Sequence, residues 1–312
     1  MSAGPGPIAF GLQLPVQSQS SLYVRAWERE AGPDEVVAVA QACDAAGFDY
    51  VAVCDHVAIP AERAEAMGTE WWDTVATLAF VAARTERVRL LSHVTVLPYR
   101  HPLVVAKAWA TLDVLSGGRA VLGVGAGHVE EEFAALGVPF AERGALLDEA
   151  IDAVRSALGA EFASHHGRVW SFEGLGQRPR PVQERLPVWV GGSSPAAVRR
   201  AAERGDGWLP QGPPKEGMPA AIERLLDLRA AAGRAHEPFT IGALSGPLHV
   251  GEPGWDAGRC VSGPPEKVAA YLRTYRDLGC HQVQVGFASR SADELCDQIA
   301  AFAAEVAPLV NA

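Results

Sequence analysis

Short apolar segments alternate with amphipathic helical segments eight times along this 312-residue sequence. The apolar segments span 8–15, 50–54, 88–97, 120–124, 188–191, 207–210, 239–250 and 282–287. Helical periodicity occupies 34–46, 73–84, 103–115, 130–136, 140–158, 195–204, 218–232, 264–278 and 292–306. Because parallel strands need crossover connections, this alternation predicts a parallel sheet. Eight such units in about 300 residues favour one closed (β/α)8 TIM barrel over an open, doubly wound sheet.

The chain carries no linker or internal repeat that would divide it, so we expect a single barrel domain over residues 1–312. The stretch 159–187 is the least regular, and we expect an excursion from the barrel with small strands there. Residues 251–263 are expected to form a long loop before the next helix.

The acidic balance of the sequence, with a formal net charge of -10, argues against phosphate-rich partners. An acidic surface repels nucleic acid and anionic lipid unless basic residues cluster, and no such cluster occurs. No segment reaches the roughly 18 apolar residues of a membrane span, and Met1–Pro7 lacks the pattern of a signal peptide. The 5 cysteines are scattered and odd in number, which indicates reduced thiols. We therefore expect a cytoplasmic protein that binds neither nucleic acid nor membrane.

The position of the active site follows from the expected fold. In a barrel of this kind the loops that follow the strands gather on one face, and that face carries the active site. The residues just after each apolar segment are therefore the candidates. They are Asp55, His56, His93, Val94, Thr95, Gly125, Gly127, His128, Gly191, Gly192, Ser193 and Ser194, together with 208–211, His249 and 286–290.

The segment from Gly191 to Pro195 has the pattern of an anion site. Glycines let the backbone approach a ligand, Pro195 suits the first turn of a helix, and free N–H groups at a helix N-terminus bind phosphate. A simple capping turn without a ligand is the alternative. Gly123, Gly125 and Gly127 have the wrong spacing and context for a dinucleotide fingerprint, so we interpret them as a place where a planar ring can approach the backbone.

His56 and His128 are the candidate acid–base residues, because imidazole titrates near neutral pH. Each could instead be a hydrogen-bonded surface group. Trp71, Trp72 and Trp208 are candidates for an aromatic substrate pocket, with core packing as the alternative. The sequence contains no HExxH, clustered Cys/His, GxSxG or P-loop motif, so we expect neither a bound metal nor hydrolase or NTPase chemistry of those kinds.

Three blocks of the sequence are distinctive in combination. They are LPYRHPLVVAKAWATLDVLSGGRAVLGVGAGHVEEEFAALGVPFAERGALLDE from Leu97 to Glu149, PVWVGGSSPAAVRRAAERGDGWLP from Pro187 to Pro210, and GFDYVAVCDH from Gly47 to His56. With the strand pattern, they resemble the luciferase-like monooxygenase superfamily, and in particular its branch that uses the deazaflavin coenzyme F420.

The resemblance implies a cofactor that lies across the barrel mouth with its phosphate on Gly191–Ser194. It also implies a non-proline cis peptide bond at His93–Val94, behind the ring of the cofactor. In similar deazaflavin dehydrogenases a histidine after the second strand contacts the reacting centre, and His56 occupies that place. Their sugar-phosphate members also carry a tryptophan four residues later and a glutamate just past the fourth-strand glycines. Pro60 and His128 stand at these positions, which argues against the sugar-phosphate reaction.

The leading hypothesis is an F420-dependent oxidoreductase that transfers a hydride between C5 of the deazaflavin and a small organic substrate. His56, or else His128, would exchange a proton with the substrate, and Asp55 would orient His56. Arg100 or Arg290 would face the anionic tail of the cofactor. The alternatives are an FMN-dependent monooxygenase that uses O₂ and a non-catalytic barrel that binds a ligand. Similar proteins are often homodimers, so a homodimer is a further possibility.

Overall fold

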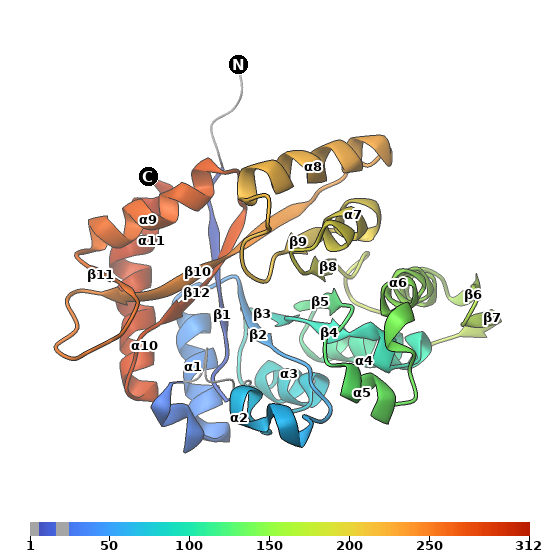
Figure 1. Cartoon of the computed structure of the whole chain (residues 1–312), viewed down its shortest axis with the longest axis horizontal. Helices are drawn as coiled ribbons and strands as arrows, with labels where there is room; N and C mark the ends of the chain where they lie inside the picture. The colour runs from blue at the N-terminus through green and yellow to red at the C-terminus, as the bar shows by residue number, and fades with distance from the viewer. Residues whose placement is uncertain (1–5, 17–24) are drawn as a thin grey trace.

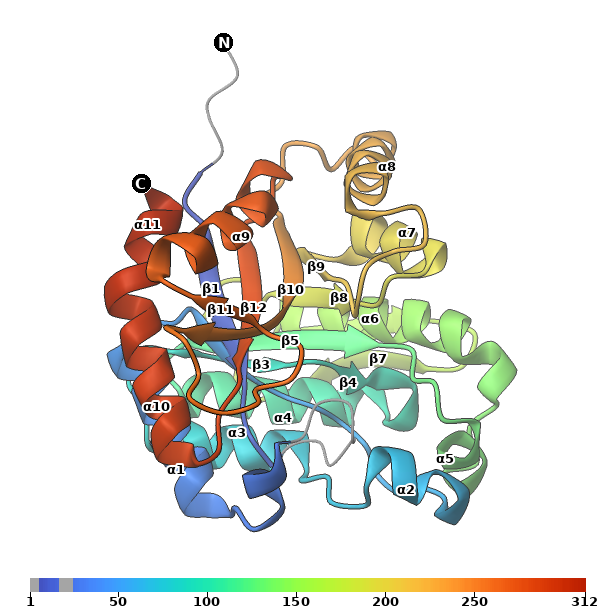
Figure 2. The same cartoon turned by 60° about the vertical axis from the view of Figure 1, so that its left-hand side comes forward.

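The computed structural model describes residues 6–16 and 25–312, and its centre is a closed ring of parallel strands (Figures 1 and 2). The strands of the ring are β1 (Ala9–Gln13), β2 (Tyr50–Val53), β3 (Arg89–Ser92), β4 (Thr95–Val96), β5 (Ala120–Gly125), β8 (Val188–Gly191), β9 (Gly207–Leu209), β10 (Thr240–Val250) and β12 (Gln282–Phe287). β12 closes the ring by pairing with both β10 and β1. β3 and β4 form one interrupted strand, because both pair with β5. The predicted (β/α)8 barrel is therefore confirmed.

Helices between the strands surround the barrel (Figure 2). They are α1 (Pro33–Ala45), α2 (Ala64–Met67), α3 (Thr74–Ala82), α4 (Pro102–Leu115), α5 (Glu130–Ala135), α6 (Arg143–Gly159), α7 (Pro195–Arg204), α8 (Met218–Ala231), α9 (Pro265–Asp277), α10 (Ala292–Ala301) and α11 (Ala307–Asn311). Short 3-10 turns η1 (Ala26–Arg29), η2 (Ala61–Arg63), η3 (Leu97–Tyr99) and η4 (Phe140–Glu142) lie in the loops. The segment Met1–Pro7, interpreted above as lacking a signal peptide, lies mostly outside the described residues.

Side-chain caps set several helix starts. Asp73 and Ser194 each accept a hydrogen bond from the backbone N–H three residues later, before α3 and α7. Such caps satisfy donors that a helix leaves unpaired at its first turn. Asp34, where the helical pattern was predicted to begin, lies inside α1, whose N-cap is Gly32 with Pro33 at the first helical position. The helix therefore begins one residue earlier than predicted.

The last helix is longer than predicted. Helical backbone continues from α10 through a π turn at Phe302–Val306 and ends with α11 at Asn311. Val310 is fully buried, so the apolar stripe of the helix also continues. The side-chain amide of Asn311 exchanges two hydrogen bonds, of 2.8 and 3.1 Å, with the backbone of Ile8 just before β1. These contacts fix the end of the last helix beside the first strand.

Two irregular regions were expected, and both are found. β6 (Phe162–His166) and β7 (Ser171–Gly176) form an antiparallel hairpin that projects beside α6, away from the barrel (Figure 1). Within 251–263, the backbones of Gly251 and Gly263 exchange hydrogen bonds of 2.8 and 3.0 Å, and β11 (Val261–Gly263) extends β10. The long loop is therefore anchored at both of its ends.

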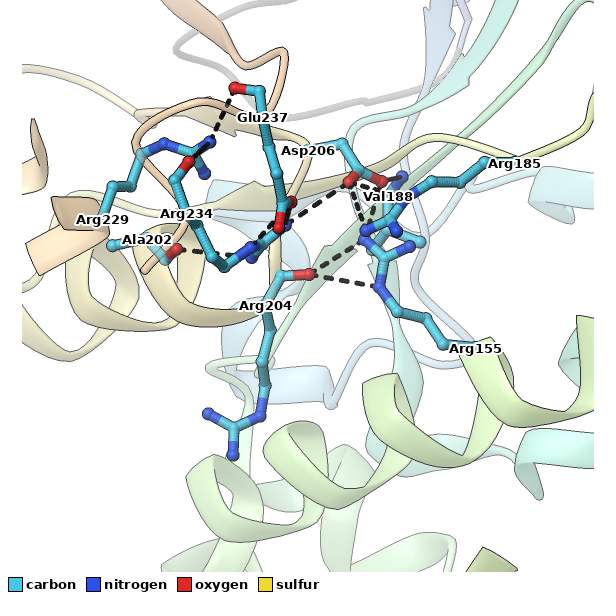
Figure 3. A network of polar contacts seen from close by, with 9 residues as sticks. All are labelled: Arg155, Arg185, Val188, Ala202, Arg204, Asp206, Arg229, Arg234 and Glu237. Carbon is cyan, nitrogen blue, oxygen red and sulfur yellow. Dashed lines mark hydrogen bonds and ion pairs between the residues drawn. The ribbon is translucent and has the colours of Figure 1, made fainter. Parts of the chain in front are cut away.

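Ion pairs around Asp206 lie at the amino end of β9 (Figure 3). Arg155 and Arg185 donate to the carboxylate of Asp206 at 2.7 and 2.8 Å, and the backbone N–H of Val188 donates at 2.9 Å. Arg234 lies 3.7 Å from the same carboxylate. Barrel enzymes carry their chemistry at the opposite, carboxyl end of the strands, so we assign this network to the stability of the scaffold.

Candidate active site

A cavity of about 730 Å³ opens at the carboxyl ends of the strands. Its volume lies within the range of small-molecule and cofactor sites. Many residues selected from the sequence line it: Asp55, His56, Trp71, His93, Val94, Gly125, Gly127, His128, Gly191, Gly192 and Ser194. Loops from all around the ring therefore bring most of the candidates to one place.

Val94 stands between two glycines in the wall of the cavity. The peptide bond between His93 and Val94 is cis, which confirms the expectation drawn from the resemblance. A Cβ atom at Gly125 would lie 2.4 Å from Cγ2 of Val94, and one at Gly191 would lie 2.5 Å from Cγ1. Only glycine at both positions therefore lets β5 and β8 approach this side chain. The side chain of Val94 therefore fills the space that side chains at positions 125 and 191 would take.

A buried carboxylate holds His56. Nδ1 of His56 lies 2.7 Å from Oε2 of Glu132, whose side chain is fully buried. The backbone N–H groups of Val57 and Ala58 donate to Oε1 of Glu132 at 2.7 and 3.1 Å, and the hydroxyl of Tyr99 donates to Oε2 at 3.2 Å. Burial opposes ionisation, but the bonds from His56 and the backbone lower the pKa of Glu132. An ionised Glu132 needs the proton on Nδ1, so Nε2 of His56 is the nitrogen available to a ligand.

Two aromatic rings flank His56. The ring centroids of His56 and Trp71 are 4.4 Å apart, and those of His56 and His128 are 5.5 Å apart. His128 is partly exposed at the cavity rim. Partial desolvation, and then the positive charge of His56, lower the pKa of His128. His128 is therefore neutral at pH 7 and can accept a hydrogen bond.

Asp55 does not orient His56, which corrects the expectation from the sequence. Its buried carboxylate forms a two-pronged ion pair with Arg100 at 2.6 and 2.7 Å and accepts a bond from the N–H of Val96 at 2.8 Å. Successive residues of an extended chain point to opposite sides, so Asp55 and His56 face different partners. Arg100 is committed to this pair and is not available to an anionic tail.

The loop after β8 offers fewer donors than its sequence suggests. The N–H of Gly192 donates to the carbonyl of Leu209 at 3.0 Å, within the sheet. Ser193 does not line the cavity, because its hydroxyl donates to the carbonyl of Gly212 at 2.6 Å. Ser194 does line the cavity while it caps α7. Of the predicted anion site, the start of α7 is therefore the part that faces the cavity with its capping residue.

An arginine adds positive charge at this end of the cavity. Arg200 follows Ala197 by about one turn of α7, and both line the cavity. Arg200 is 4% exposed, and Asp148 holds its guanidinium at 2.5 Å. Arg200 was not predicted, because candidates were sought just after the strands and Arg200 lies inside a helix. Its spacing of about one helical turn from Ala197, which places both on one face of α7, is the signal that could have identified it. Arg290 is not available here, because it pairs with Glu294 at 3.0 Å.

Only one of the three selected tryptophans lines the cavity. Trp71 does so, but Trp208 is fully buried in the core outside the barrel and donates to the carbonyl of Gly192 at 2.8 Å. Trp72 packs at the edge of the same core. Thr95 is buried next to the cavity wall but does not line the cavity. Side chains alternate along a strand, so a residue at a strand end can face the helices instead of the barrel.

Two further polar residues line the cavity. Glu28, in η1, accepts bonds from the N–H groups of Val16 and Arg25 at 3.1 and 2.9 Å, and burial raises its pKa. Gln284, in β12, faces the barrel interior and contacts His93 at 2.9 Å. Gln284 had a usable signal, because it is one of two buried glutamines, with Gln282, in a strand whose other residues are Val, Gly and Phe. Glu28 had none, because η1 is too short to show a period.

Within the part of the chain that the structure describes, no group of three His, Cys, Asp or Glu side chains is placed to hold a metal ion. Among the same residues, no helix combines the length and apolar character needed to cross a bilayer.

The barrel and its glycine-walled cavity define a (β/α)8-barrel enzyme site. A family model described as luciferase-like monooxygenase matches residues 8–257. The chain therefore belongs to the luciferase-like monooxygenase family and is an oxidoreductase.

Named relatives agree with this assignment. An F420-dependent hydroxymycolic acid dehydrogenase of Mycobacterium tuberculosis is 32% identical over 276 residues, covering 80% of this chain and 74% of the relative. An F420-dependent glucose-6-phosphate dehydrogenase of Amycolatopsis mediterranei is 30% identical over 236 residues, covering 68% and 69%. The crystal structure of the monooxygenase RslO1 from Streptomyces bottropensis superposes with a TM-score of 0.79 at 23% identity, over 96% of this chain and 99% of that one. A flavin or deazaflavin cofactor is thus indicated.

Proposed function

We propose that this protein is an F420-dependent oxidoreductase that transfers a hydride between C5 of the deazaflavin and a small organic substrate. The observation that carries the choice of cofactor is the similarity to two F420-dependent dehydrogenases, at 30% and 32% identity over more than two thirds of the chain.

The residues around the cavity suit a tricyclic ring with a phosphate-bearing tail. Gly125 and Gly191 make room for the side chain of Val94, which lines the cavity where the face of a flat ring would lie. Ser194 lies at the α7 end of the same cavity, where its hydroxyl and the helix N-terminus would hold a phosphate, while Arg200 beside them is paired with Asp148. The fit does not distinguish a deazaflavin from FMN, so that choice rests on the relatives.

The chemistry that the deazaflavin supplies when bound is hydride exchange at C5. The protein's part is to orient the substrate and to hold a proton at Nε2 of His56. Glu132 fixes the opposite nitrogen of this ring at 2.7 Å, and Trp71 packs against it. When a carbonyl group is reduced, the proton moves from Nε2 to the carbonyl oxygen. When an alcohol is oxidised, Nε2 accepts the hydroxyl proton.

His128 would contact the substrate as a hydrogen-bond acceptor at the rim. The apolar side chains of Leu12, Met67, Trp71 and Phe287 line the cavity. This combination suits an uncharged organic molecule with one alcohol or carbonyl group.

Binding measurements test the choice of cofactor. Purified protein is titrated with F420 and with FMN, and quenching of tryptophan fluorescence reports binding, since Trp71 lines the cavity. We expect F420 to bind at least tenfold more tightly than FMN. Tighter binding of FMN would overturn the proposal.

The second candidate is an FMN-dependent monooxygenase that uses O₂. The close superposition on the monooxygenase RslO1 supports it at the level of the fold. Oxygen uptake distinguishes the two functions, because reduced deazaflavin reacts poorly with O₂. Rapid O₂ consumption with reduced FMN and this protein would favour the second candidate.

A further inference from the structure

A short chain of polar side chains lies in the barrel interior beneath the cavity. Nδ1 of His93 is 2.9 Å from Oε1 of Gln284, and the hydroxyl of Tyr50 donates to the same oxygen at 3.5 Å. A carboxamide oxygen only accepts hydrogen bonds, so Nδ1 of His93 carries the proton. Nε2 of His93 is then a neutral acceptor.

This acceptor has no partner within the described chain. His93 is 3% exposed and lines the cavity, and burial lowers its pKa to about 4, so the ring stays uncharged at neutral pH. Buried polar atoms in proteins are nearly always paired, because an unpaired one is costly. The orphaned nitrogen therefore points to a donor that the chain itself does not supply.

Neighbouring side chains donate their hydrogen bonds to atoms other than Nε2 of His93. The side-chain amide of Gln13 donates to Sγ of Cys54 at 3.0 Å, and that thiol donates to the carbonyl of His93 at 3.5 Å. The hydroxyl of Ser92 donates to the carbonyl of Gly123 at 2.7 Å. A molecule in the cavity, either a ligand or a water, is the remaining source.

We propose that Nε2 of His93 accepts a hydrogen bond from an N–H or O–H group on the edge of the bound ring system, which makes His93 a residue that holds the cofactor ring. This inference rests on the proposed function. F420 and FMN share an N–H group on the pyrimidine ring. Only the deazaflavin carries a hydroxyl on the opposite ring, where FMN carries a methyl group.

The test compares the wild type with His93→Phe, which fills similar space without an acceptor, and with His93→Gln, which retains one. Dissociation constants for F420 and FMN are measured by fluorescence quenching. Loss of the acceptor leaves a buried donor unpaired, so we expect His93→Phe to weaken binding by about tenfold to a hundredfold, and His93→Gln to weaken it less. Thermal unfolding of each apo-protein shows that the variant is folded.

Thr95→Val is the matched control. Thr95 lies two residues away and also has a buried, unpartnered polar atom, but it does not line the cavity. Its variant should bind both ligands as the wild type does. If it weakens binding as much as His93→Phe does, the effect is a disturbance of the strand and the inference is overturned.

The two ligands identify the donor. If His93→Phe weakens the binding of F420 alone, the donor is the ring hydroxyl. The absorption spectrum of oxidised F420 bound to the wild type should then be that of the form with an un-ionised hydroxyl. If His93→Phe weakens the binding of both ligands equally, the donor is the pyrimidine N–H. Unchanged binding of both by a folded His93→Phe variant overturns the inference.

A measurement on the unmodified protein covers the case in which His93→Phe does not fold. The ¹⁵N resonance of Nε2 of His93 should move toward its protonated position when the ligand is added, and no movement would overturn the inference. If the wild type binds neither ligand, the proposed function fails first, and this inference fails with it.

Discussion

Nδ1 of His56 and the carboxylate of Glu132 lie 2.7 Å apart, although 76 positions separate the two residues. The contact joins the loop after β2 to α5, which follows β5. The same carboxylate also holds the backbone of Val57 and Ala58, so one buried group fixes both the ring and the loop that carries it.

Glu132→Gln should destabilise the protein in a pH-dependent way. The folded-state pKa of Glu132 is lowered, so its contribution is present above the unfolded carboxyl pKa and is lost as the pH falls. We expect a loss of about 1–3 kcal/mol in unfolding free energy at pH 7, and a smaller loss near pH 4. Urea unfolding at both values measures it. The neighbouring Glu131→Gln is the control and should change the unfolding free energy by less than about 1 kcal/mol, because Glu131 is exposed and its ion pair with Arg63 lies at the surface. A loss that does not change with pH would contradict this account.

Removing both partners of the Asp55–Arg100 pair should cost less than the sum of the costs of removing each partner alone. The carboxylate of Asp55 is buried, while the side chain of Arg100 is 27% exposed. Arg100→Leu should lower the unfolding free energy by about 2–4 kcal/mol, at the lower end for a buried pair because of that exposure. The variant with both Arg100→Leu and Asp55→Leu should lose less than the sum of the single variants. Additive losses in a double-mutant cycle would show that the pair is not coupled.

Two glycines of the cavity should differ in how strongly a substitution by alanine lowers the unfolding free energy. A Cβ at Gly125 would overlap Val94, whereas a Cβ at Gly286 meets no atom within 4 Å. Gly125→Ala should therefore lower the unfolding free energy by about 1–3 kcal/mol, the usual cost of overpacking. Gly286→Ala should change it by no more than about 0.5 kcal/mol. Urea unfolding of the two variants measures both losses. Equal losses would show that Val94 does not pack tightly against Gly125.

The pKa of His128 should depend on the presence of His56 beside it. Partial burial and the charge of His56 both lower the pKa of His128. NMR titration should therefore find it below the ordinary value for histidine, and His56→Ala should raise it. Trp71→Phe, which alters the other neighbour of His56, should leave it unchanged. A pKa of His128 that does not respond to His56→Ala would contradict the 5.5 Å ring contact.

Most of the scaffold could be predicted from the sequence. The bounds of the strands at 188–191 and 282–287 agree with the structure, because each is a short apolar run between clear turn signals. The cis bond at His93–Val94 came from the family resemblance, since no local pattern encodes it.

Side-chain direction in the site could not be predicted. Asp55 and His56 are adjacent in the sequence but face Arg100 and Glu132, which depends on how distant segments pack. Glu132 is the last of three consecutive glutamates, and only the packing of α5 makes it the one that turns inward. Trp208 was a candidate for the pocket, and the alternative of core packing is the one that the structure shows.

The contact between Ile8 and Asn311 has a consequence for synthesis of the chain. β1 leaves the ribosome well before its partner β12 and before the anchoring Asn311, which lies 303 positions after Ile8. Until β12 has emerged, one edge of β1 therefore lacks the strand that pairs with it in the folded barrel. Open strand edges pair readily with other chains. The nascent protein thus has its greatest need of chaperone protection just before the ring is sealed, and the Asn311 amide completes that seal.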